Sequence, residues 1–181
     1  MKMLFGVLAL VLGAVLIAKP ALAQPKYLLP KTDPRKYGGY SPHASSMYGR
    51  HARDHARTLY HYGRRWQSVP KERIEEHVAG VRSNLDAANK EMATLKAAKP
   101  DDKDVQTQVA TIEGHFAKCD EMCKMMQETA ASDKPDMDKM CDCCATMCRE
   151  LDAANAQHDK LMKKLGIEAL EDPKSEGSKK R

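Results

Sequence analysis

The sequence predicts an all-α protein folded as an antiparallel up-down-up-down four-helix bundle. Its apolar residues recur at alternating steps of four and three over four long segments, which is the pattern of helices that pack along a seam. Prolines separate these segments, and no segment alternates apolar and polar residues as a half-buried strand does. Helices of about 15 to 30 residues joined by short turns must run antiparallel to their neighbours.

Residues 1–23 have the pattern of a signal peptide. Lys2 supplies a positive start, residues 3–18 are almost wholly apolar, and Ala21-Leu22-Ala23 is a small-residue cleavage site. We therefore expect an exported protein, periplasmic or secreted after cleavage following Ala23. A retained transmembrane anchor is the alternative, but an apolar run of about 16 residues is shorter than the roughly 20 that a membrane span needs.

Residues 24–43 are predicted to form an extended or disordered lead-in, because they carry four prolines and the pair Gly38-Gly39. The bundle itself is predicted over residues 44–166, with a weak seam in the first helix and strong seams in the other three. The seam positions are Tyr48, Ala52, His55, Leu59 and Tyr62; Ile74, Val78, Val81, Leu85, Ala88, Met92 and Leu95; Val105, Val109, Ile112, Phe116, Cys119, Cys123 and Met126; and Met137, Cys141, Cys144, Cys148, Leu151, Asn155, His158, Met162 and Leu165.

Prolines and capping residues mark the ends of the predicted helices. The prolines at the expected helix starts are Pro70, Pro100 and Pro135. Ser68 and Asp133 are candidate N-caps, and Gly166 follows the last seam residue as a C-terminal cap. Residues 167–181 are mostly polar, so we expect a disordered tail there.

The register of the last two helices follows from a turn at Asp133-Lys134. Folding the chain at this point sets Cys119 opposite Cys148 and Cys123 opposite Cys144. The same fold sets Met126 opposite Cys141, so seam sulfurs from both helices are predicted to meet inside one end of the bundle.

Histidines of the first two helices are predicted to lie at the same end. A turn near Trp66-Gln67 would put His55 across from Val78, with His77 beside it. Folding about Pro100 sets Val78 opposite Cys123, which predicts that these histidines approach the sulfurs.

The charge of the chain indicates no polyanionic partner. Loss of Lys2 and Lys19 with the leader lowers the net charge from +5 to +3, because residues 1–23 contain no acidic residue. Basic and aromatic residues crowd residues 50–66, but behind a signal peptide we expect no nucleic acid. Contact with an anionic surface is the alternative to a solvated basic face.

The cysteines are the feature that most directly suggests a function. All six, together with six of the eleven methionines, fall between Cys119 and Cys148. Cys119 and Cys123 share an i, i+4 spacing, as do Cys144 and Cys148, which places each pair on one face of a helix. Facing thiols become disulfides in an oxidising compartment, whereas reduced thiols among methionines suit a soft metal ion.

The segment Cys119-x3-Cys123 to Cys144-x3-Cys148 resembles the twin CX3C pattern of small disulfide-stapled helical hairpins. The resemblance implies bonds Cys119 to Cys148 and Cys123 to Cys144, each stabilising by about 2 to 4 kcal/mol. The protein would then be a structural or interaction bundle without a metal. This interpretation leaves Cys141 and Cys143 unexplained, because residues two apart on a helix do not share a face.

The chain also resembles bacterial copper-storage proteins, four-helix bundles whose cores are lined with cysteines that hold Cu(I). The resemblance rests on export, the helix count, the inward CxxxC spacing and the nearby histidines. Thiolate and thioether donors prefer Cu(I), while imidazole also accepts zinc, which is the alternative ion. The resemblance implies sequestration or handling of a few ions, since the first two helices carry no cysteine. The candidate ligands are Cys119, Cys123, Cys141, Cys144, Cys148 and Met126, with one or more of His51, His55 and His77.

Familiar catalytic motifs are missing from the sequence, so we expect no enzyme. It contains no CxxCH string for haem attachment, no Glu-x-x-His pair for a di-iron bundle and no glycine-rich phosphate loop. Cys141-x-x-Cys144 has the spacing of a thiol-redox pair, which makes disulfide exchange a third hypothesis. The oligomeric state stays open, because a bundle with one weak helix can complete its core by dimerising.

Overall fold

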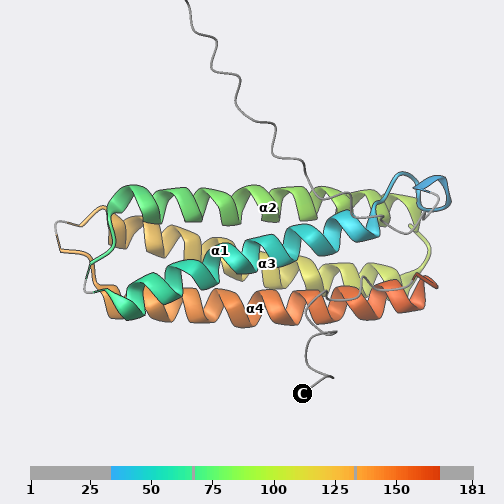
Figure 1. The fold of residues 1–181 in the computed structure, drawn as a ribbon. Helices are drawn as coiled ribbons and strands as arrows, with labels where there is room; N and C mark the ends of the chain where they lie inside the picture. The colour runs from blue at the N-terminus through green and yellow to red at the C-terminus, as the bar shows by residue number, and fades with distance from the viewer. Residues whose placement is uncertain (1–33, 67, 133, 168–181) are drawn as a thin grey trace, which may run out of the picture.

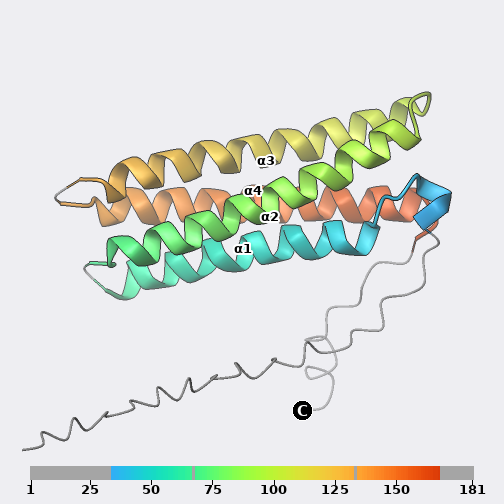
Figure 2. The same ribbon diagram turned by 90° about the horizontal axis from the view of Figure 1, so that it is seen from above.

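The computed structural model describes residues 34–66, 68–132 and 134–167, and it confirms the predicted all-α four-helix bundle. Within these ranges the chain forms four α-helices, a short 3-10 helix and no strand. The elements are η1 (Pro34–Tyr37), α1 (Pro42–Arg65), α2 (Lys71–Ala98), α3 (Lys103–Ala130) and α4 (Met137–Lys164). Each helix runs antiparallel to the next, and α4 returns to pack on α1 (Figures 1 and 2).

The helices begin close to the predicted prolines, but their caps differ from those expected. Asp136, not Asp133, caps α4 by accepting a hydrogen bond from the backbone N of Lys139 at 3.0 Å. Asp133 lies outside the described residues. Ser68 does not cap α2, whose N-cap residue is Pro70.

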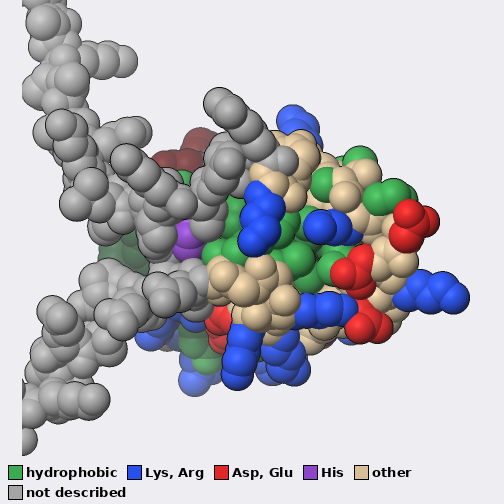
Figure 3. Space-filling view, turned by 90° about the vertical axis from the view of Figure 1, so that its right-hand side faces the viewer, with side chains coloured by type: hydrophobic (Ala, Val, Ile, Leu, Met, Phe, Trp, Pro, Cys, Tyr) green, Lys and Arg blue, Asp and Glu red, His purple; other side chains and the backbone are tan. Residues whose placement is uncertain are grey.

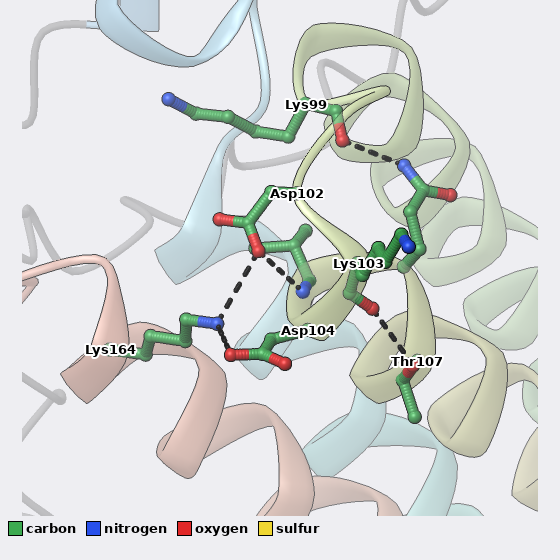
Figure 4. Close-up of polar contacts among 8 residues, drawn as sticks. Lys99, Asp102, Lys103, Asp104, Thr107 and Lys164 are labelled. Atoms are coloured by element: carbon green, nitrogen blue, oxygen red, sulfur yellow. Dashed lines mark hydrogen bonds and ion pairs between the residues drawn. The ribbon is translucent and has the colours of Figure 1, made fainter.

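Asp102 caps α3 and also ties this helix to the end of α4. Its carboxylate accepts from the backbone N of Val105 at 3.1 Å, which satisfies one of the free N–H groups at the start of the helix. Lys164 Nζ lies 3.4 Å from Asp102 Oδ1 and 2.7 Å from Asp104 Oδ2 (Figure 4). The last turn of α4 is thereby held against the first turn of α3.

The predicted seams of α2 and α3 are confirmed, because every seam residue of both helices is buried. The seam of α4 is broader than predicted. Met140, Cys143 and Met147 are also buried. Four predicted seam residues are only half-buried, namely Met137, Cys148, Asn155 and Leu165. The row Met140, Cys143 and Met147 lies beside the predicted row Cys141, Cys144 and Cys148 on this face. Hydrophobic periodicity alone therefore could not predict that both rows supply buried side chains.

The seam predicted for α1 is confirmed only at Ala52 and Leu59, because the buried face is rotated slightly from the predicted line. The buried line passes through Gly49, Ala52, Ala56 and Leu59, while His55 is half-buried and Tyr62 is 37% exposed. Small side chains give a weak apolar signal, but they let α1 approach its neighbours closely. A Cβ atom at Gly49 would collide with the side chain of Asn155 on α4.

The end of the predicted lead-in is folded, not extended. Gly38 and Gly39 adopt positive φ angles of 62° and 94°, and this turn carries Tyr40 into the core, where it is fully buried. The hydroxyl of Tyr37 donates to the backbone O of Leu165 at 2.8 Å. Residues 37–40 therefore close one end of the bundle, at which Lys and Arg side chains surround apolar surface (Figure 3).

The chain leaves α4 as expected, with Gly166 at φ 70°. Ile167 is 7% exposed and donates its N–H to Met162 O at 2.9 Å, so it belongs to the bundle and not to the predicted tail. The predicted leader 1–23 and the remainder of the predicted tail lie outside the described residues. None of the helices in the described ranges combines the length and the apolar composition that a membrane crossing requires.

Candidate metal centre

The cysteines converge where α3 and α4 pack together, near the end at which these two helices are joined. Cys119, Cys123 and Cys144 have no exposed surface, and Cys143 and Cys141 are 3% and 6% exposed. Cys148 alone is half-buried. The seam sulfurs are thus buried inside the bundle as predicted. Their register differs from the prediction, because Met126 contacts Cys144 and not Cys141, and Cys123 contacts Met147 and not Cys144.

Methionine sulfurs separate the thiols of the two helices. The thiol of Cys123 on α3 contacts Met147 Sδ on α4 at 3.7 Å. In the opposite direction, the thiol of Cys144 on α4 contacts Met126 Sδ on α3 at 3.8 Å. Thiol and thioether donors of both helices therefore interleave in one buried cluster, which we call the sulfur cluster.

The disulfides of the alternative interpretation are not formed, and all six cysteines are free. Cys119 Sγ faces the backbone O of Met147 at 3.9 Å instead of bonding to Cys148, and Cys123 contacts Met147 instead of bonding to Cys144. In the structure, Met147 thus supplies the contacts of the two α3 thiols that the disulfide interpretation assigned to Cys148 and Cys144.

Burial controls the protonation of the cluster. It raises the pKa of Cys119 to about 12 and that of Cys123 to about 11. The pKa of Cys144 is raised further, first by burial and then by four neighbouring thiols. These neighbours are Cys141, Cys148, Cys143 and Cys123. The thiols therefore stay protonated at neutral pH, and an ion must displace their protons in order to bind.

Cys143 belongs to the sulfur cluster although the sequence interpretation left it unexplained. Its thiol is buried on α4 and raises the pKa of Cys123 on α3. The row Met140, Cys143 and Met147 has helical spacing of its own, beside the predicted seam. That second row is the signal that would have identified Cys143.

The predicted histidine ligands lie apart from the sulfur cluster. His51, His55 and His77 line an open groove between α1 and α2. The cysteines belong to α3 and α4, and none of them lines this groove. The rotation of α1 turns His55 toward the flank of α2, so the structure does not bring the predicted histidine ligands together with the predicted sulfur ligands.

Cys148 connects the cluster to the surface. Its side chain lines a groove between α1 and α4, together with Arg53, Arg57, Arg149 and Asp152. Burial and then Asp152 raise the pKa of the Cys148 thiol, while the three arginines oppose that shift. Cys148 is therefore the thiol of the cluster that is most accessible from the surface.

Glycine at position 63 lets α1 cover the other side of the cluster. A Cβ atom there would lie 2.6 Å from Cys141 Sγ and 3.1 Å from Met140 Cε. The last turn of α1 thus packs directly on the sulfurs of α4.

No known protein family, curated protein or solved structure matches this chain. Across the described residues, no three side chains of His, Cys, Asp or Glu already surround a common point as metal ligands do. The function is therefore inferred from the chemistry of the side chains.

Proposed function

We propose that this protein binds Cu(I) in the sulfur cluster between α3 and α4, and that it sequesters or hands on copper without catalysing a reaction. The observation that carries the proposal is the contact of free buried thiols with methionine sulfurs at 3.7 and 3.8 Å. Thiolate and thioether are the soft donors that Cu(I) prefers. The proposed ligands are the six cysteines with Met126 and Met147.

A buried cluster favours a neutral complex. Uncompensated charge is costly in an apolar interior, so each Cu(I) is best matched by one thiolate, with thioethers and neutral thiols completing its coordination. Methionine suits this role because it binds without losing a proton. We therefore expect one proton to be released for each ion bound.

Small shifts of α4 bring the donors around an ion. The methionine side chains are flexible and polarisable, which allows them to rearrange within a packed core. Cys148 supplies the first thiolate at the surface groove, and Cys144 receives the ion further inside. The leader pattern of residues 1–23 supports export of the protein that carries this site.

The raised pKa values argue against the thiol-redox hypothesis. Reactive cysteines have depressed pKa values, whereas burial raises those of Cys141 and Cys144.

The disulfide-stapled alternative and the copper-binding protein differ in the number of free thiols that each predicts. Alkylation of the mature protein with and without prior reduction, followed by mass spectrometry, counts them. Four to six reactive thiols support copper binding, and none or two would support the staples.

An anaerobic Cu(I) titration against a competing chromophoric chelator tests the proposal directly. Met126→Leu removes a thioether while nearly conserving volume, and it should weaken copper binding. Met92→Leu is the matched control, since Met92 is equally buried but belongs to α2. Equal affinities of the two variants would remove Met126 from the site, and a chain that binds no Cu(I) would end the proposal.

A further inference from the structure

The groove between α1 and α2 holds a close pair of histidines. His55 Nδ1 lies 3.1 Å from His77 Nδ1, with ring centroids 5.3 Å apart and ring planes at 62°. Two nitrogens bound to one ion at about 2.0 to 2.1 Å are separated by about 2.9 Å in octahedral and about 3.4 Å in tetrahedral coordination. The observed separation falls within this range, so a modest rotation of the rings would direct both lone pairs at one ion.

Gly80 makes this pair possible. A Cβ atom at this position would lie 2.6 Å from both Cε1 and Nε2 of the His55 ring. Only glycine lets the ring lie against α2, one turn away from His77. Tyr62 packs on the His77 ring from the other side, with centroids 6.0 Å apart. The chain thus holds both imidazoles in place from two helices.

The surroundings of the pair suit a cation. The groove is also lined by Asp54, Thr58 and His51. His51 lies one turn before His55 on the same face of α1 and its side chain is exposed, so it is free to swing toward the pair. Burial, followed by the neighbouring His55, lowers the pKa of His77.

The geometry points to a second metal site in this groove, for a divalent transition-metal ion held by His55 and His77, with His51 as third ligand and water beyond. Imidazole is a donor for Ni(II), Cu(II) and Zn(II), whereas the sulfur cluster offers soft donors. The three histidines are not already arranged around one point, so His51 must change rotamer on binding. This site does not depend on copper binding by the cysteines.

Ni(II) is the probe, because thiols reduce Cu(II) but not Ni(II). Calorimetric titration of the full chain with reduced thiols at pH 7.5 should give one Ni(II) per chain. His55→Asn and His77→Asn should each weaken binding at least about tenfold, more than His51→Asn. His61→Asn, an exposed position on the same helix, should leave the affinity unchanged.

Gly80→Ala tests whether Ni(II) binding requires the arrangement of the histidines or only their presence in the chain. The added methyl group must displace the His55 ring while all ligands are retained, so Ni(II) binding should weaken here too. Gly114→Ala is the matched control, because nothing lies within 4 Å of its added methyl group. Circular dichroism of each variant shows that the helices are intact.

Absence of Ni(II) binding would overturn the inference, as would equal losses in the His61 variant and the His55 and His77 variants. Unchanged binding in both the His55 and His77 variants would show that the pair is only a hydrogen bond between two helices. Paramagnetic broadening confined to the ring signals of His51, His55 and His77 would support the site. Broadening centred on His115 or His158 would contradict it.

Discussion

Burial has opposite consequences for metal binding at the α3/α4 interface and in the α1/α2 groove. Burial favours the neutral form of an ionisable side chain in both places: it raises the pKa of Cys119 to about 12 and lowers that of His77. A neutral thiol must still lose its proton before it binds a metal ion, whereas a neutral imidazole is already a ligand. The same physical effect thus makes metal binding by the sulfur cluster dependent on proton release and favours the form of His77 that binds metal ions.

The largest expected difference between the two regions is in stability. Phe116 is 4% exposed on the α3 seam, one turn before Cys119, and Phe116→Ala should lower the free energy of unfolding by about 3 to 5 kcal/mol. His77→Asn, at the half-buried groove, should change it by less than about 1 kcal/mol. Chemical denaturation measures both. Wild-type stability in the Phe116 variant would contradict the assignment of the α3 seam.

The comparison extends to His158, a buried histidine at the end of the bundle that residues 37–40 close. Tyr40 Oη lies 2.7 Å from His158 Nε2, and burial, with His43 and Arg50 nearby, lowers the pKa of His158 from 6.5 to about 4. Above pH 6.5 neither the folded nor the unfolded state protonates this ring. Between pH 6.5 and 4 only the unfolded state does so, and the free energy of unfolding should fall by about 3 kcal/mol from this residue.

Denaturation of the wild type and His158→Gln at pH 7.0, 5.5 and 4.5 measures this contribution. The variant should be less stable at pH 7.0 and less sensitive to acid. Parallel pH profiles of the two proteins would show that His158 titrates normally and is not held neutral by the core.

Substitution of two glycines tests how closely α1 packs on the sulfur cluster. Gly63 lies on α1, and Gly114 on α3 is the control position. Gly63→Ala should destabilise the protein by about 1 to 3 kcal/mol, because the new methyl group meets Cys141 Sγ. Gly114→Ala, on an open helix surface, should stabilise by up to about 1 kcal/mol. Thermal melts of the two variants compare them, and similar shifts of the same sign would argue against close packing of α1 on Cys141.

The sequence predicted those parts of the fold in which large apolar side chains mark the buried face. Val81 and Leu85 on α2 and Ile112 on α3 illustrate this, since the core of both helices follows the predicted positions. On α1 the buried face also contains Gly49 and Ala56, which the prediction missed because their weak apolar signal is exceeded by the tyrosines beside them.

The sequence predicted that buried sulfur side chains gather at the candidate site, but not which of these side chains contact one another. Cys143 lies on the second buried row of α4, and a wide sulfur face has no single period. The contact of His55 with His77 followed from the expected turn near Trp66-Gln67, yet their separation from the cysteines depends on the rotation of α1. Close helix contacts at glycines determine this rotation, and a pattern of apolar residues contains no signal for such contacts.

The pH dependence of binding is the smallest effect, and it distinguishes the two regions. Because the pKa of Cys123 is raised to about 11, each Cu(I) must release a proton throughout the neutral range. Copper affinity should therefore fall about tenfold from pH 8 to pH 7 for each proton released. Ni(II) affinity at the histidine groove should change far less over this interval, as titrations at both pH values would show. Equal slopes would mean that the two ions share one kind of ligand.

X-ray absorption spectroscopy of the Cu(I)-loaded protein tests the central claim most directly. If copper binds in the sulfur cluster, the spectrum should show sulfur atoms alone in the first coordination shell, and His55→Asn should leave it unchanged. A nitrogen shell with the outer scattering of imidazole rings, lost in the His55 variant, would contradict this assignment and place the copper in the groove between α1 and α2.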